Sequence, residues 1–114
     1  MDKYPSTSTD PIERFWDRYI KLLVKQGVKE SAQRWYVLRA EHYIKTFPDK
    51  KLAQHTAADI TGYLEKMGRS GHLIDWQFRQ AVVAIRNLFL IITNKWEEQI
   101  DWQYWLDSST WKNN

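Results

Sequence analysis

The chain contains no cysteine, four glycines and three prolines among its 114 residues. Without cysteine it can form no disulfide, thiolate metal site or cysteine nucleophile. So few glycines and prolines argue against a loop-rich scaffold. The longest apolar run, residues 88–93, is far shorter than the roughly 18 residues of a membrane span, and the N-terminus lacks the layout of a signal peptide. We therefore expect a cytoplasmic protein with no membrane partner.

Patterns for catalysis and metal binding are also missing. His42, His55 and His72 do not have the spacing of metal ligands, and a lone histidine such as His55 is more often structural than functional. The stretch from Gly68 to Gly71 has the composition of a turn, and it lacks the pattern of a phosphate-binding loop. We expect no catalytic residue, no metal and no cofactor, so the chain is not predicted to be an enzyme.

What the chain does contain is enough apolar and aromatic material for one domain. Hydrophobic residues make up 43% of the sequence and aromatic residues 15%, which suits a single packed core of this length. The formal net charge is +3, but residues 12–95 hold 15 Lys and Arg against 8 Asp and Glu, a local charge of +7. The basic middle of the chain favours a polyanionic partner.

The first half of the sequence predicts two helices. Asp10 supplies an N-cap just before a proline, and apolar residues then recur at helical spacing until Gly27. Ser31 is the predicted N-cap of a second helix, which ends at Phe47 because the residue before Pro48 avoids the α conformation.

Two more helices are predicted in the second half. Thr56 and Asp59 have the spacing of a capping box and open a helix that is expected to end at Gly68. Asp75 is the predicted N-cap of the last long helix, whose apolar period continues to about Asn94. All these periods are helical, which predicts an all-α fold, a four-to-five-helix bundle.

The ends of the chain have different compositions. Residues 1–9 have too few apolar side chains to repay ordering and are expected to form a loose arm. Residues 10–107 are expected to form the single helical domain, with a short aromatic helix after residue 95 that packs on the core, and residues 108–114 are expected to fray. Three apolar side chains of this last part are predicted to be buried: Trp96, Ile100 and Trp102.

Basic and amide side chains on two of the helices suggest a DNA-binding surface. Arginine and glutamine are the residue types that contact phosphates and the edges of guanine and adenine. The basic and amide side chains that we single out here are Lys29, Arg34, Arg39, Arg69, Gln77, Arg79, Gln80 and Arg86. From the residues alone, ordinary solvated helix faces explain this pattern equally well.

Three motifs in order resemble a known family. They are Trp35-Tyr36-Val37 followed by Tyr43-Ile44, then DITGYL at residues 59–64, and QAVVAIRNLF at residues 80–89. Together they resemble the core-binding region of tyrosine recombinases, and most closely the N-terminal, SAM-like domain of integron-type integrases. The resemblance covers about residues 12–95, and each motif by itself is degenerate.

The resemblance implies a DNA-binding function. In that family the helices equivalent to residues 31–47 and 75–94 face the major groove of one recombination half-site. Matching the family's motifs residue by residue points to Arg34 and Arg39 on the first of these helices, and to Gln77, Arg79, Gln80 and Arg86 on the second. All of these except Arg86 are then expected on one exposed, positively charged face, while a guanidinium paired inside the bundle explains Arg86 equally well. The implied partners are double-stranded DNA, a C-terminal catalytic domain of the same protein and the other protomers of a recombination synapse. The strand-cleaving residues of the family belong to that catalytic domain. Asp75-Trp76 departs from the Ser-Thr pair with which many members open the last helix, so Trp76 is expected to pack or stack in place of a hydroxyl contact to phosphate.

Two other classes of protein compete with this interpretation. A small helical protein-interaction module with no role in DNA binding would have the same periodicity, its basic faces being only solvated. An independent helix-turn-helix repressor requires two helices joined by three or four residues. The predicted linkers, residues 47–56 and 68–75, are too long for that motif.

Overall fold

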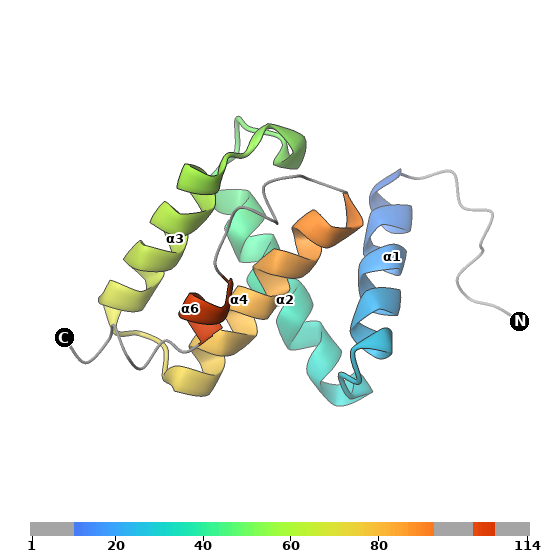
Figure 1. Ribbon diagram of the computed structural model, residues 1–114. Helices are drawn as coiled ribbons and strands as arrows, with labels where there is room; N and C mark the ends of the chain where they lie inside the picture. Colours follow the sequence, from blue (N-terminus) through green and yellow to red (C-terminus); the bar gives the residue numbers. More distant parts are fainter. Residues whose placement is uncertain (1–10, 93–101, 107–114) are drawn as a thin grey trace, which may run out of the picture.

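The computed structural model describes residues 11–92 and 102–106, and every regular element in these ranges is helical (Figure 1). The elements are α1 (Pro11–Lys25), α2 (Glu30–Thr46), the short 3-10 helix η1 (Leu52–Gln54), α3 (Ala57–Ser70), α4 (Asp75–Ile91) and α6 (Trp102–Leu106). The all-helical prediction is confirmed for these residues. The predicted arm (1–9), Trp96, Ile100 and the C-terminal end (108–114) lie outside the described residues.

The first helix ends where the glycine predicts. Gly27 has φ +83°, the left-handed conformation that glycine adopts without steric cost. Its N–H donates to the Val24 carbonyl at 3.0 Å, and the N–H of Val28 donates to the Leu23 carbonyl at 3.0 Å. This pair of hydrogen bonds is a Schellman motif, which satisfies carbonyls that the helix would otherwise leave without a donor.

The second helix begins earlier than predicted. Its N-cap is Lys29, not Ser31, which lies inside the first turn. The side chain of Lys29 makes no capping hydrogen bond. Instead, the Gln33 amide reaches back to the Val28 carbonyl at 3.2 Å and ties the turn to the preceding loop. At the other end α2 stops at Thr46 with Phe47 as its C-cap, in agreement with the position of Pro48.

The third helix confirms the predicted start and corrects the predicted end. The Asp59 N–H donates to the Thr56 hydroxyl oxygen at 3.2 Å, and the Thr56 N–H donates to the Asp59 carboxylate at 2.9 Å. These bonds form the capping box. Gly68 does not end α3: it is buried within the helix, which continues to Ser70 and ends at Gly71, whose φ is +72°.

The fourth helix starts one residue before the predicted cap. Ile74 is the N-cap and Asp75 is the first helical residue. The side-chain carbonyl of Gln77 accepts the Ile74 N–H at 3.1 Å, so this glutamine performs the capping that we assigned to the aspartate. The helix ends at Ile91, before the predicted Asn94.

The hydrophobic core is built around α4, which packs against α1, α2, α3 and α6 (Figure 1). Tyr43, Phe78 and Phe89 are fully buried, and Tyr36 is partly buried against the same core. The predicted short C-terminal helix is α6, which buries Trp102 (6% exposed) and Trp105. The buried core consists of Tyr19, Leu23, Ala40, Tyr43, Ile60, Leu64, Phe78, Ala81, Val82, Ala84, Ile85, Leu88, Phe89, Trp102 and Trp105.

The segment between α2 and α3 is fixed by one buried histidine. His55 is 1% exposed, and its Nε2 lies 3.3 Å from the Lys50 carbonyl. Because a carbonyl can only accept, Nε2 carries the proton and Nδ1 accepts from the Tyr43 hydroxyl at 2.7 Å. Burial lowers the pKa of His55. This histidine therefore holds the loop onto the core, the structural role that its position predicted.

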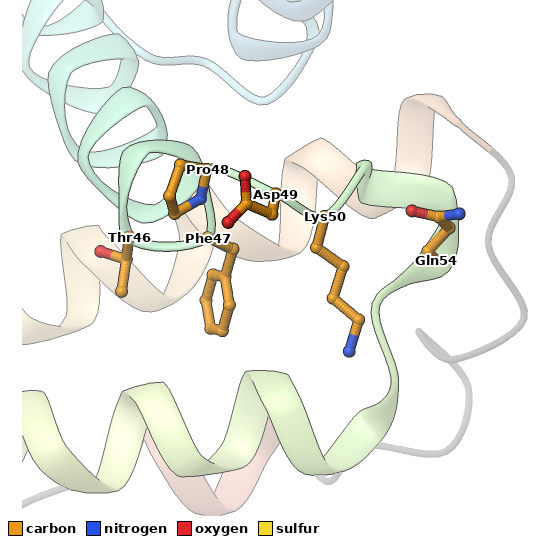
Figure 2. A pocket seen from close by; sticks show the side chains of 6 residues that line it. All are labelled: Thr46, Phe47, Pro48, Asp49, Lys50 and Gln54. Atoms are coloured by element: carbon orange, nitrogen blue, oxygen red, sulfur yellow. The ribbon is translucent and has the colours of Figure 1, made fainter.

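The same segment is joined to α3 by a charged pair. Figure 2 shows the Phe47 ring and the Lys50 side chain extending from the segment after α2 toward α3. The Lys50 ammonium lies 2.7 Å from the Asp59 carboxylate. The hydrogen bond from Lys50, together with that from the Thr56 N–H, lowers the pKa of Asp59. The capping box and the loop are thus coupled through a single carboxylate.

None of the helices in the described ranges combines the length and apolar character that crossing a membrane requires.

Candidate nucleic-acid interface

The outer side of α4 carries a continuous row of five residues. We call this row the α4 ridge: Trp76, Arg79, Val83, Arg86 and Leu90. Its members are three or four positions apart, the spacing that places side chains on one face of an α-helix. Trp76 is 57% exposed and Leu90 38% exposed, while the residues that face the other way are in the core. The ridge is therefore the part of α4 that a partner can reach.

The ridge is basic. Asp75, at the first position of α4, is the helix's one acidic residue, whereas Arg79 and Arg86 both lie on the ridge. Seven residues take an α-helix through almost two full turns, so the two arginines lie above one another. The ion pairs within residues 11–92 and 102–106, Lys50 with Asp59 and Arg69 with Glu65, do not involve Arg79. Its charge faces solvent, because Arg79 is exposed.

The second helix contributes one predicted residue next to this ridge. The Arg39 Nε donates to the Gln80 side-chain carbonyl at 3.4 Å, a contact that joins α2 to α4. Both side chains are partly buried. The structure thus brings together Arg39 and Gln80, two residues 41 positions apart that the sequence predicted to share a surface.

Arg34 does not belong to the same side of α2. Five residues rotate an α-helix by about 500°, so Arg34 and Arg39 project about 140° apart. The Arg34 guanidinium instead lies 5.0 Å from the centre of the Trp35 ring, in a cation–π contact. Lys29 is exposed at the N-cap of α2. The expectation that Arg34 and Arg39 share one face therefore does not hold.

Two further predicted residues have local partners. The Arg69 guanidinium lies 3.9 Å from Glu65, one turn earlier on the surface of α3. Such an exposed pair contributes little to stability and leaves the arginine accessible. Gln77 caps α4 through its carbonyl oxygen, which makes it a structural residue first.

Some residues near Arg39 were not singled out by the sequence. Lys45 of α2 and Lys66 of α3 line the same groove as Arg39. The sequence carries no signal for this grouping, because it depends on how α3 packs beside α2. Trp76 was expected to pack or to stack, and the structure leaves more than half of it exposed.

The turn between α3 and α4 corrects one argument from the sequence. Because α3 continues to Ser70 and α4 begins at Asp75, four residues, Gly71 to Ile74, join the two helices. This length is compatible with a helix-turn-helix connection, in which the second helix reads DNA. The linker length therefore no longer argues against that motif.

The described residues contain no group of three or more histidine or acidic side chains that is able to hold a metal ion. Comparisons of the chain with protein-family models, with curated proteins and with solved structures found no match.

Proposed function

We propose that the chain is a double-stranded-DNA-binding domain, and specifically a SAM-like core-binding domain of a tyrosine recombinase that grips one recombination half-site. The observation that carries the proposal is the α4 ridge, a helix face with exposed Trp76, Arg79 and Leu90, with partly buried Val83 and Arg86 between them, and with no acid after the first residue of the helix. Within the described residues four α-helices pack around α4, an arrangement that is compatible with this fold. A catalytic domain of the same protein and the other protomers of a synapse complete the proposal.

The dimensions of α4 suit the major groove. An α-helix with its side chains is about 10–12 Å across, and the major groove of B-DNA is about 12 Å wide. Arg79 and Arg86 are about 10 Å apart along the helix axis, which corresponds to about three base-pair steps. The apolar members Trp76, Val83 and Leu90 are of the kind that contacts thymine methyl groups or sugars.

The predicted contacts divide into two roles under this proposal. Arg79 and Arg86 would face the groove, where arginine can read guanine. Gln80, whose carbonyl oxygen accepts from Arg39, would border the groove together with Arg39 on α2. Lys29, Arg34 and Arg69 project elsewhere and would contact phosphates outside the groove. Gln77 keeps its capping bond and offers only its amide N–H groups.

The test is a fluorescence-anisotropy titration of a labelled duplex at two salt concentrations between about 50 and 200 mM. The variants are Arg79→Ala alone and Arg79→Ala with Arg86→Ala. The matched control is Lys21→Ala with Lys25→Ala, which removes the same number of positive charges from α1. We expect the wild-type domain to bind weakly, at roughly 10⁻⁴ to 10⁻⁶ M, and each lost phosphate contact to reduce the slope of log K against log salt by about 0.9.

An arginine that reads a base behaves differently. Its removal costs about 1–3 kcal/mol on the preferred sequence and little on random DNA. Circular dichroism checks that each variant is folded. If the α4 variants and the α1 control show the same affinities and the same salt slopes, α4 does not face DNA and the proposal fails.

A further inference from the structure

A groove of about 730 Å³ opens between α2, α3 and the turn that precedes α4. We call it the α2–α3 groove. Its α2 wall includes Trp35 and Leu38, each 48% exposed, and Met67 and Leu73 line it as well. Trp35 and Leu38 are three positions apart and so lie on one face of the helix. Large apolar side chains gathered in an exposed concavity mark a site where another molecule binds.

This groove is distinct from the α4 ridge. None of the ridge residues lines it, and the one residue of α4 that does is Ala81, which belongs to the core. Three of its polar lining residues make hydrogen bonds: the His42 Nδ1 lies 2.9 Å from the Tyr63 hydroxyl, and the Arg39 Nε donates to Gln80. The DNA-binding proposal therefore does not account for the groove.

Basic residues outnumber acidic residues in the lining of the groove. The lining includes three fully basic side chains, those of Arg39, Lys45 and Lys66, and one acidic side chain, that of Glu41. Lys45 and Lys66 are exposed, whereas Met67 is partly buried. The groove thus has apolar walls and exposed cations, which is complementary to an apolar molecule with acidic edges.

The size and shape of the groove suit an α-helix. Trp35 and Lys45 are ten residues apart on α2, so this wall is about 15 Å long, the length of about ten residues of helix. An amphipathic helix binds such a groove through apolar residues at positions i, i+3 or i+4, and i+7. A nucleic acid would need basic side chains along the whole groove, but most of the accessible surface that lines this groove is apolar.

We propose that the α2–α3 groove binds an acidic amphipathic helix of a partner protein. The apolar face of that helix packs on Trp35, Leu38 and Met67, and its carboxylates pair with Lys45 and Lys66. The five residues given these contacts are not assigned to DNA, so the proposal can be tested separately; Arg39 lines the groove and is also a predicted DNA contact. The proposal gives the domain a second surface, through which a protein can bind while α4 stays accessible.

The experiment selects peptides of about 16 residues from a random displayed library against the full chain. We expect the enriched peptides to carry an excess of Asp and Glu and apolar residues at helical spacing. Synthetic versions are then titrated by fluorescence anisotropy. Leu38→Glu should weaken binding about tenfold or more, because it places a carboxylate among apolar contacts and repels an acidic ligand.

Charge-reversal variants separate the site from general attraction to a basic protein. Lys45→Glu with Lys66→Glu should weaken peptide binding strongly, while Lys21→Glu with Lys25→Glu on α1 makes the same change of charge elsewhere and should leave it nearly unchanged. Arg79→Ala should not affect it. Since Leu38, Lys45 and Lys66 are exposed, these variants should fold, which circular dichroism verifies.

Four results would overturn the proposal. If the enriched peptides have no excess of acidic residues, the groove does not bind an acidic helix. The same conclusion follows if Leu38→Glu leaves the affinity of the peptides unchanged. If the wild-type protein sediments as a dimer and Leu38→Glu dissociates that dimer, the groove is a contact between copies of this chain. Loss of duplex affinity in the Lys45 and Lys66 variant, equal to that in the α4 variants, assigns the groove to the DNA surface.

Discussion

The side-chain amides of Gln26 and Asn87 exchange two hydrogen bonds, each 2.9 Å long, across the interface of α1 and α4. Asn87 is fully buried, whereas Gln26 at the end of α1 is exposed. The pair satisfies an amide that is surrounded by apolar core. It also fixes the register of the two helices, since hydrogen-bonded amides tolerate little sliding.

Gln26→Leu should destabilise the fold by about 1–3 kcal/mol, because it leaves the buried Asn87 amide without its partner. The double variant Gln26→Leu with Asn87→Leu should recover most of this loss, since no buried polar group then lacks a partner. Urea denaturation measures both. A double variant no more stable than the single one would contradict this account of the pair.

The stability of the protein should fall as the pH falls from about 7.5 to 5. Burial lowers the pKa of His55 in the folded state below its ordinary 6.5, so the unfolded chain binds more protons in this range. The stabilisation is therefore complete above pH 6.5 and is lost below it.

The measurement is the free energy of unfolding of wild type and His55→Gln at several pH values. The variant should be less stable at neutral pH and show a flatter dependence, whereas the exposed His72→Gln should keep the wild-type slope. Working above about pH 5 avoids Asp59, whose lowered pKa adds a loss of stability only below its ordinary 3.8. Equal slopes for wild type and His55→Gln would refute the assignment.

Two glycines of α3 and its C-cap should respond oppositely to alanine. Gly71 ends α3 with φ +72°, so Gly71→Ala should cost about 1–2 kcal/mol of backbone strain. Gly62 lies within the helix, and the space that a Cβ atom would occupy there is open, so Gly62→Ala should stabilise the fold by about 0.5–1 kcal/mol. Thermal unfolding gives both shifts, and a stabilising Gly71→Ala would show that the turn adopts another conformation.

The short C-terminal helix should contribute to the core through one of its two adjacent aromatic residues. Trp105 is 7% exposed and Tyr104 is 45% exposed. Trp105→Ala should destabilise the protein by about 3–5 kcal/mol, the usual cost of truncating a buried tryptophan. Tyr104→Ala serves as the neighbouring control and should have a much smaller effect in the same denaturation experiment. Similar losses from both would mean that α6 does not dock as described.

The helices could be predicted because short-range capping and stop residues define them. The predicted boundaries differ from the observed ones where two candidate capping or stop residues lie close together. The capping box of Thr56 and the stop at Gly27 depend only on residues within a few positions, so the pattern identified them. Ser31 and Asp75 are good caps in isolation, but Gln33 and Gln77 bond to the preceding backbone and start each helix earlier. Gly68 is a weak stop because a better one, Gly71, follows it within one turn.

For the candidate site, the sequence could predict only which residues share a face of a single helix. The common face of Arg79 and Arg86 follows from their spacing, whereas the contact of Arg39 with Gln80 depends on how α2 crosses α4. The burial of Asn87 also requires the position of α1. Sequence periodicity gives the face of each helix but not which faces meet, so the α2–α3 groove could not be predicted.

The central position of α4 determines how the domain opens. This helix packs against α1, from which it is separated in the chain by both α2 and α3, and against α6, which follows it. The amides in the middle of α4 therefore reach solvent only after both α1 and α6 have separated from it. In hydrogen exchange these amides should exchange together and last, at a rate set by complete unfolding, while those at the ends of α1 exchange by local opening.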